Sequence, residues 1–356
     1  FLYGERGGRA FAVLHTVDEA VARRARPDLE ILDPFALGLV ALIESGMDRE
    51  DAVDEVHVRA CRELGVTRAV VPRSFPLALA DRLRAAGVEL TVDGPRFERR
   101  RRVKAGAELD GIRRASRAAE AGMAAAAALL ARARPAGDAL HADGEALTSE
   151  RLQREIRAAV TARDCRLDEL IAAGGAQGVE GHHPGSGPLA PGVPIVVDVW
   201  PQDRASGCWS DMTRTFVVGT PADDVVAWHG LARDALARTA ALLAPGITGR
   251  ELWEVACDVF EAAGEPTQRD PQGREPLRDG FFYSLGHGVG LEVHEAPTLG
   301  RSGRDPLVPG DVVALEPGTG RHGYGGARVE DLFLVTEDGC EPLTRFPYEL
   351  DPQTAA

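Results

Sequence analysis

The chain has 356 residues, of which 44% are hydrophobic, so it can form one large or two ordinary domains with a sizeable core. Its formal net charge of −14 argues against nucleic acid as a partner, because phosphate binding requires clustered positive charge. No apolar run reaches about 18 residues, so we predict no membrane-spanning helix and no membrane partner. The five cysteines are scattered and form no CxxC pair, which favours reduced thiols in a cytoplasmic protein.

The first hundred residues alternate strand-like and helix-like segments. Apolar runs predict strands at 11–17, 68–72 and 88–94, and helical spacing predicts helices at 48–65 and 77–87. This alternation is typical of an open α/β sheet, so we predict a smaller α/β domain over residues 1–100. Because the chain begins at Phe1 without a Met or a signal-like segment, we expect this domain to be incomplete at its N-terminus.

A charge-rich segment, RFERRRRVK at 96–104, follows this domain. Such an arginine run suits a polyanion, but we favour a solvated linker that leads into a helix. Helical periodicity then predicts long helices at about 107–133 and 148–163.

From about residue 107 onward the sequence predicts two helices followed by strands, and this order then occurs a second time. Strand-like and glycine-rich segments extend over 171–219, and they precede a second pair of helices at about 223–243 and 249–263. The latter helix opens with the T-x-x-E pattern of a capping box. The polar segment 264–283 is predicted to be a loop, and strands return at 311–315 and 327–336. A site at the seam of two similar halves would gather residues from both.

One ordered series of metal-ligand candidates lies in this second half. Each candidate occupies a strand-like or glycine-rich run: Asp198 in IVVDVW, Asp211 in SDMTRTFVVG, His287 in GHGVGLEVHEAP, Glu316 in ALEPG and Glu330 in GARVEDLFLV. Four carboxylates and one imidazole are too many for a single zinc site, which usually takes three or four ligands rich in His or Cys. They suit two divalent ions that share bridging carboxylates, an arrangement used in metal-assisted hydrolysis.

Each candidate also has a plainer interpretation. Asp198 and Asp211 taken singly suit turn or cap residues, and His287 and His294 suit buried core histidines with satisfied hydrogen bonds. Carboxylates inside apolar strands need partners of opposite charge, which favours the metal hypothesis for the set. Strand alternation places Arg328 on the same face as Glu330, so we expect an ion pair between Arg328 and the acids of the site.

The motifs SDMTRTF, GHGVGLEVHEAP, EPG and RVED, in this order, resemble the signature of the pita-bread metallopeptidases. Within that family the chain is most similar to the Xaa-Pro peptidases, aminopeptidase P and prolidase. The resemblance covers about 100–349, and the N-terminal segment is similar to the creatinase/prolidase N-terminal domain. It implies an α/β (α+β) fold in which residues 101–356 form a catalytic domain of two pseudo-symmetric helix–helix–strand halves.

The same resemblance implies a division of the five ligands between two metal ions. Asp198 ligates one ion, Asp211 and Glu330 bridge the two, and His287 and Glu316 complete the other. A metal-bridging hydroxide would be the nucleophile, since coordination lowers the pKa of water. Mn²⁺ is the metal that we expect, because the site is rich in oxygen ligands, with Zn²⁺, Co²⁺ and Fe²⁺ as alternatives.

Further residues have implied roles beside the ligands. Glu316 would transfer the proton of the nucleophile, and His294 would donate a hydrogen bond to the carbonyl oxygen as it becomes anionic. The stretch HHPGSG matches a family histidine that contacts the substrate; His182 is our choice and His183 the alternative. Arg328 is also expected to contact the substrate.

The chain departs from the family pattern after the first aspartate. Val199-Trp200-Pro201 stands where the family commonly has Leu/Phe-Gly, and the following hairpin, about 201–208, is longer than usual. We expect this departure to alter the rim of the pocket and not metal binding.

The resemblance implies a cytoplasmic, homodimeric, metal-dependent enzyme that cleaves the N-terminal Xaa-Pro bond of peptides or dipeptides. An alternative is a metal-dependent relative that acts on a small non-peptide molecule as a lyase or an amidohydrolase. A third is a non-catalytic binding member of the fold, which would be expected to lose ligands that this chain retains.

Overall fold

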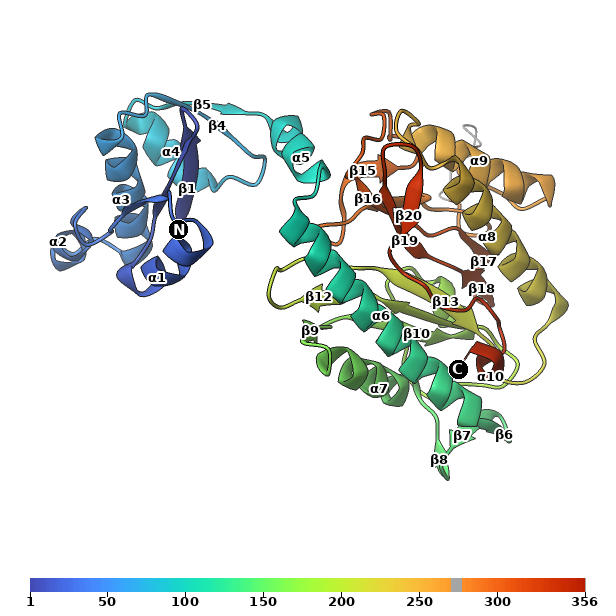
Figure 1. The fold of residues 1–356 in the computed structure, drawn as a ribbon. Coiled ribbons are helices and arrows are strands. Elements are labelled where there is room, and N and C mark those ends of the chain that lie inside the picture. The colour runs from blue at the N-terminus through green and yellow to red at the C-terminus, as the bar shows by residue number, and fades with distance from the viewer. Residues whose placement is uncertain (270–276, 356) are drawn as a thin grey trace. The chain divides into compact units, whose positions relative to one another are not determined.

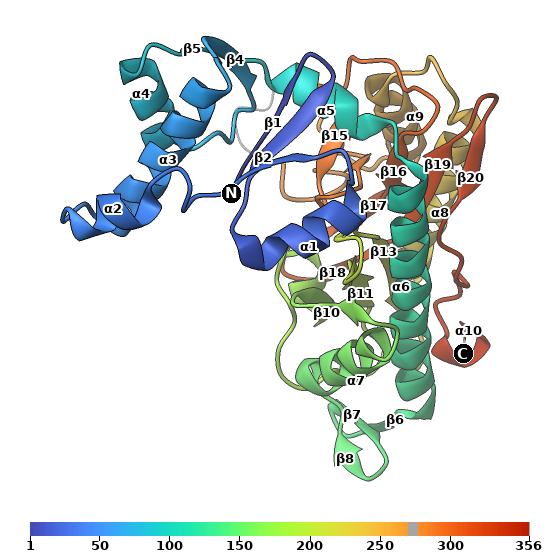
Figure 2. The same ribbon diagram turned by 60° about the vertical axis from the view of Figure 1, so that its left-hand side comes forward.

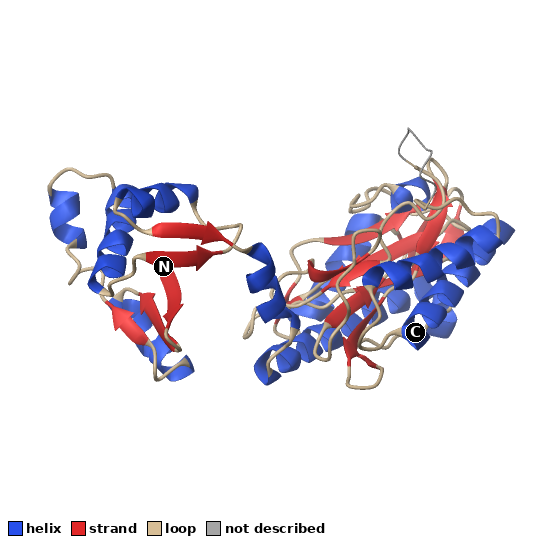
Figure 3. Ribbon diagram, turned by 90° about the horizontal axis from the view of Figure 1, so that it is seen from above, coloured by secondary structure: helices blue, strands red, loops and turns tan. Residues whose placement is uncertain are grey.

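The computed structural model describes residues 1–269 and 277–355, and the chain divides into two compact units, Phe1–Phe97 and Glu98–Ala356 (Figure 1). In each unit helices flank the strands (Figure 3). The larger unit carries the sequence motifs described above.

The smaller unit contains two short sheets. Its sheets have the order β1-β2-β3 and β4-β5 and are built from β1 (Leu2–Arg6), β2 (Arg9–Val13), β3 (Glu30–Leu32), β4 (Arg68–Val71) and β5 (Glu89–Val92). Its helices are α1 (Thr16–Ala25), α2 (Leu39–Glu44), α3 (Arg49–Glu63) and α4 (Leu77–Ala85). The predicted strand at 11–17 ends early because His15 caps α1, its Nδ1 accepting a hydrogen bond from the Val17 amide at 3.2 Å.

The arginine-rich segment lies at the boundary of the two units and is largely exposed, as predicted, but it is itself helical and its end is buried. It forms α5 (Gly94–Arg102), and the last turn of α5, which belongs to the larger unit, contacts acids of that unit. The buried Arg102 donates to both carboxylate oxygens of Asp311, at 2.8 and 2.6 Å. Lys104, the single lysine of the sequence, lies 2.5 Å from Glu295 and is also buried. Buried charges of this kind are retained where a carboxylate partner compensates for lost hydration.

The first half of the larger unit packs a helix pair on an antiparallel sheet. Its helices are α6 (Gly106–Arg132) and α7 (Ser149–Thr161), which lie side by side in Figures 1 and 2. The sheet has the order β10-β11-β13, with β10 (Leu170–Gly174), β11 (Ile195–Val199) and β13 (Met212–Phe216). Short strands flank it: β6 (Arg134–Ala136), β7 (Ala139–Ala142), β8 (Glu145–Ala146), β9 (Cys165–Arg166) and β12 (Gln202–Asp203). A 3₁₀ turn, η1 (Gly175–Val179), follows β10.

The second half repeats this plan with α8 (Asp223–Leu242) and α9 (Gly249–Ala262). Thr248 and Glu251 form the predicted capping box of α9. The five-stranded sheet, in the order β15-β14-β16-β19-β20, consists of β14 (Gly286–Gly288), β15 (Glu295–Leu299), β16 (Val312–Leu315), β19 (Asp331–Val335) and β20 (Cys340–Pro342). Between β16 and β19 the chain forms a hairpin of β17 (Gly318–Arg321) and β18 (Gly325–Arg328). The described chain ends with α10 (Pro352–Ala355).

Two segments of this half differ in part from the elements that the sequence predicts. The strand predicted at 327–336 is two strands, because β18 pairs with β17 whereas β19 pairs with β16 and β20. Val329 and Glu330 form the break between them. Of the predicted loop 264–283, residues 270–276 lie outside the described part of the chain, and its flanks meet in a bridge between Thr267 and Phe281.

Candidate active site

A pocket of about 560 Å³ lies where the two halves of the larger unit meet. Its lining combines strands of the first sheet with strands of the second, and it includes every sequence-predicted site residue except the alternative His183: His182, Asp198, Asp211, His287, His294, Glu316, Arg328 and Glu330. These side chains come from both halves, as expected for a site at the seam between them.

Local strand geometry directs the acids of the first half into the pocket. Asp198 lies on β11 directly opposite Thr213 of β13, and Asp211 precedes β13 by one residue. Successive strand residues point to opposite faces of a sheet. Val196 and Asp198 therefore face the pocket. The alternating residues Ile195, Val197 and Val199 pack in the hydrophobic core.

Three buried carboxylates come together at the base of the pocket. Asp198, Asp211 and Glu330 each offer an oxygen that lies within 4.8 Å of the other two. Asp198 Oδ1, Asp211 Oδ1 and Glu330 Oε1 are buried without a hydrogen-bond partner. Burial, followed by repulsion from neighbouring acids, raises the pKa of Asp211 and of Glu330 well above the usual range. Such a cluster is electrostatically unfavourable unless cations or protons compensate for it.

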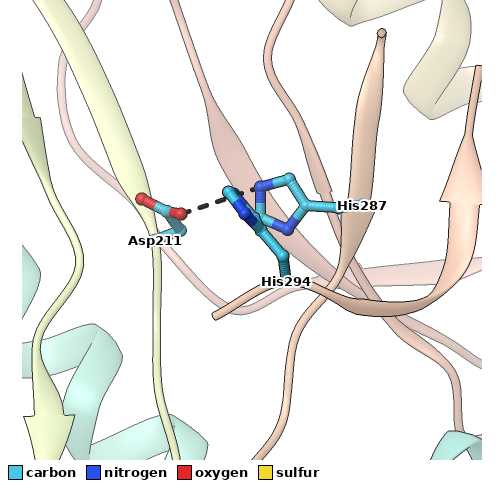
Figure 4. A group of neighbouring side chains, drawn as sticks. All are labelled: Asp211, His287 and His294. Carbon is cyan, nitrogen blue, oxygen red and sulfur yellow. Dashed lines mark ion pairs between the residues drawn. The ribbon is translucent and has the colours of Figure 1, made fainter. Parts of the chain in front are cut away.

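His287 faces this cluster from β14. Its Nε2 lies 3.8 Å from Asp211 Oδ2 (Figure 4). It also lies 3.8 Å from Glu316 Oε1 and 4.0 Å from Glu330 Oε1, and all three distances are too long for direct hydrogen bonds. Its Nδ1 lies 3.2 Å from the carbonyl of Gly288, a contact that leaves Nε2 free to accept. Burial lowers the pKa of His287 to about 3, so the ring is neutral, the form that ligates metals.

Glu316 follows β16 and closes another side of the pocket. Its side chain is 19% exposed, and its backbone amide donates to the carbonyl of Leu285 at 2.8 Å. Burial raises the pKa of Glu316 to about 7, although the positive charge of Arg328 opposes that rise. A carboxyl group that titrates near neutral pH can both accept and return a proton.

The donor set fits divalent cations. Carboxylate oxygens and a neutral imidazole are the ligands that such ions take, and the buried oxygens lack other partners. Asp211, His287 and His294 also each offer a ligand atom within 4.8 Å of the other two (Figure 4). The two imidazole rings are arranged edge to face, with their centroids 4.1 Å apart. Proximity alone therefore does not separate His294 from the ligands, so its assignment to the substrate stays a prediction.

Arg328 forms the expected ion pair with an acid of the site. Its guanidinium donates to Asp198 Oδ2 at 2.5 Å, and its Nε is buried without a partner. Thr215 holds the backbone of Arg328, with its hydroxyl accepting from the amide at 3.0 Å and donating to the carbonyl at 2.9 Å. Arg328 is therefore paired with Asp198 in this structure. A contact between Arg328 and the substrate stays a prediction.

The two neighbouring histidines occupy different surroundings. His182 lines the pocket. The Nδ1 of His183 instead accepts a hydrogen bond from the amide of Gly185 at 3.0 Å, so it stabilises its own loop. Position therefore favours His182 as the residue that can reach a substrate. The departure after Asp198 is also visible, because Trp200 lines the pocket.

Sequence reasoning missed the residues that hold Glu330. Thr213 Oγ1 donates to Glu330 Oε2 at 2.7 Å, which leaves Oε1 free to face the cluster. Arg214 donates to the carbonyl of Glu330 at 2.7 Å and to both oxygens of Asp331 at 2.9 and 3.1 Å. The signal for Thr213 was its position two residues after Asp211, on the same face of a strand.

A family model described as "Metallopeptidase family M24" matches residues 110–337. The chain belongs to metallopeptidase family M24. This M24 chain is 31% identical over 281 residues to "Probable dipeptidase PepE" of Mycobacterium tuberculosis, covering 79% of this chain and 68% of the relative. It is 36% identical over 141 residues to "Xaa-Pro dipeptidase" of Pyrococcus furiosus, covering 40% of this chain and 37% of the relative.

Solved structures share the fold of the M24 chain. The "Xaa-Pro dipeptidase from Bacillus anthracis" aligns with a TM-score of 0.79 at 24% identity, covering 98% of this chain and 88% of that chain. The predicted pita-bread fold, with a preceding α/β domain, is confirmed. Membership also establishes the chain as a metallopeptidase that uses divalent ions. No helix among the described residues has both the length and the apolar character needed to cross a bilayer.

Proposed function

We propose that this M24 peptidase removes an N-terminal residue that precedes proline, with two divalent ions held by Asp198, Asp211, His287, Glu316 and Glu330. The observation that carries the proposal is the group of buried carboxylate oxygens without partners at the base of the pocket. The printed names of relatives, which include Xaa-Pro dipeptidases, support the substrate class.

Each proposed ligand has a distinct place in the cluster. Asp211 and Glu330 would be shared by the two ions, Asp198 would serve one ion, and His287 with Glu316 the other. When bound, the ions supply a nucleophile from water at neutral pH and polarise the scissile carbonyl. The oxygen-rich donor set favours Mn²⁺.

The chain's own residues then move protons and bind the substrate. Glu316 accepts a proton at its carboxylate and returns it to the leaving nitrogen. Burial lowers the pKa of His294, so its neutral ring offers one N–H to the carbonyl oxygen as negative charge develops. His182 contacts the substrate near the scissile nitrogen, and Arg328 keeps Asp198 oriented while facing the substrate.

Proline after the scissile bond suits this arrangement. The nitrogen of an Xaa-Pro bond carries no hydrogen, so a site that requires an N–H donor from the substrate cannot use it. Here the described pocket supplies aromatic and aliphatic surface for the ring from Phe282, Tyr283 and Val293. The proposed homodimer and cytoplasmic location are further expectations of the same assignment.

The test compares Ala-Pro with Ala-Ala, and Ala-Pro-Ala with Ala-Ala-Ala, in the Mn²⁺-loaded protein. We expect cleavage of the proline substrates at a kcat/KM at least about tenfold higher, a difference of about 1.4 kcal/mol in transition-state binding. Glu316→Gln should abolish most of the cleavage of the proline substrates. Glu254→Gln, which changes a partly exposed acid of α9, should not. A preference for Ala-Ala, or no peptide cleavage by the metal-loaded protein, would contradict the proposal and favour a non-peptide substrate.

A further inference from the structure

Two residues of the pocket lie outside the metal cluster but share the sheet face of Asp198. Along β11 and its continuation, Val196, Asp198 and Trp200 all line the pocket. The intervening Val197 and Val199 are buried in the core. This alternation places the ring of Trp200 beside Asp198 on the pocket side, about 7 Å farther along the strand.

Glu169 directly precedes β10, and Trp200 directly follows β11. Leu170 pairs with Val199 in the antiparallel register of these strands, and continuing that register by one residue would bring Glu169 opposite Trp200. Residues that face each other in this way have Cβ atoms about 4.5–5.5 Å apart on the same side of the sheet. Both side chains accordingly line the pocket, next to the site of the reaction.

The charge of Glu169 is not compensated within the described chain. Its side chain is exposed to the pocket, and no described residue forms a hydrogen bond or an ion pair with it. The adjacent Asp168, in contrast, is paired with Arg166 at 3.1 Å. Arg328 is the single permanent cation among the described lining residues, and its guanidinium is bound to Asp198. Glu169 therefore offers an unshared negative charge to whatever enters the pocket.

A carboxylate beside an indole ring is a combination that binds organic cations. The carboxylate attracts the positive charge, and the face of a Trp ring adds a cation–π attraction when the cation approaches within about 6 Å.

We propose that Glu169 and Trp200 form a subsite for a positively charged group on the first residue of the substrate. This inference rests on the proposed function, because it takes the substrate to be an Xaa-Pro peptide. Proline and the scissile carbonyl carry no positive charge, so the cation belongs to Xaa. It is either a Lys or Arg side chain or the α-ammonium group, and both have the same chemistry.

The experiment measures kcat/KM for Lys-Pro, norleucine-Pro and Ala-Pro with the wild type, Glu169→Gln and Asp168→Asn. Norleucine has the aliphatic chain of lysine without its charge, and Asp168→Asn removes an equal charge from the residue next to Glu169. If the side chain is bound, the wild type prefers Lys-Pro to norleucine-Pro by about fivefold to tenfold, as expected for one partly exposed ionic contact with a cation–π component. Glu169→Gln removes that preference, and Asp168→Asn retains it.

If the α-ammonium group is bound, Glu169→Gln lowers kcat/KM for all three substrates by a similar factor, and Asp168→Asn does not. In either case Trp200→Leu should produce part of the effect that Glu169→Gln has on the same substrates, and Trp200→Phe should stay closer to the wild type. A Glu169→Gln variant that matches the wild type on all three substrates would overturn the proposal.

A binding measurement separates this proposal from the proposed function. Analogues of Lys-Pro and norleucine-Pro in which a methylene replaces the scissile carbonyl cannot be cleaved, and the additional amine is common to both. Calorimetric titration of the Mn²⁺-loaded protein should show weaker binding to Glu169→Gln than to Asp168→Asn, even if no Xaa-Pro peptide is hydrolysed. Equal affinities for the two variants would overturn the subsite while leaving the cleavage result to decide the function.

Discussion

The hydroxyl of Thr213 provides the sharpest test of how the protein prepares Glu330 for metal binding. Thr213 is fully buried, Glu330 is 2% exposed, and the hydrogen bond between Thr213 Oγ1 and Glu330 Oε2 is 2.7 Å long. Thr213→Val keeps the shape of the side chain and removes only this donor. A hydrogen bond to a charged group contributes about 1.5–3 kcal/mol, and losing such a contact behind a ligand typically lowers metal affinity by about 10–100-fold.

The assay is a competition titration of Mn²⁺ against a chromophoric chelator, with Thr239→Val as the matched control. Thr239 is also fully buried, but its hydroxyl donates within α8 to the carbonyl of Ala235 at 2.7 Å, away from the pocket. We expect the Mn²⁺ affinity of Thr213→Val to fall by at least about tenfold and that of Thr239→Val to stay near the wild-type value. Equal affinities for the two variants would show that Thr213 does not orient a metal ligand.

Three further predictions concern proton transfer, substrate contact and pH. Glu316→Gln should lower kcat by about 10²–10⁴-fold and metal affinity far less, and equal losses in both would mean that ligation alone explains Glu316. His294→Ala should lower kcat/KM while metal content measured by mass spectrometry stays near wild type, and an emptied metal site would show that His294 is a ligand. Burial, with the charge of Arg233 adding to it, lowers the pKa of His229 to about 4 from 6.5. The unfolded chain therefore binds the proton first, and as pH falls from about 6.5 to 4 His229 should cost up to about 3 kcal/mol of stability. Denaturant unfolding of the wild type and His229→Gln across this range checks it, and identical pH profiles would contradict it.

The helix pairs and the ordered ligand candidates were predictable from the sequence because their signals are local. Amphipathic spacing defines α6 and α9 within a few residues, and the capping box at Thr248 marks where α9 begins. Asp198 and Glu316 each stand out as a charge at an apolar strand. Such a charge is costly without a partner, so its presence indicates a site.

Features that depend on contacts between distant segments were not predictable in this way. The burial of Arg102 depends on Asp311, which lies 209 residues away in sequence. The break at Val329 depends on the different pairing partners of β18 and β19. Glu169 becomes visible as a pocket residue only in the folded structure, where β10 pairs with β11 and Glu169 and Trp200 line the same pocket. Single-sequence patterns carry no information on such registers.

Metal stoichiometry decides whether one pocket binds two divalent ions through shared carboxylates. The measurement is the Mn²⁺ content per chain of the wild type, Asp211→Asn and the control Asp234→Asn, which alters an exposed acid of α8. We predict about two ions per chain in the wild type and in the control, and at most about one in Asp211→Asn, because that variant loses a bridging charge. One ion per chain in the wild type, or full occupancy in Asp211→Asn, would contradict the account.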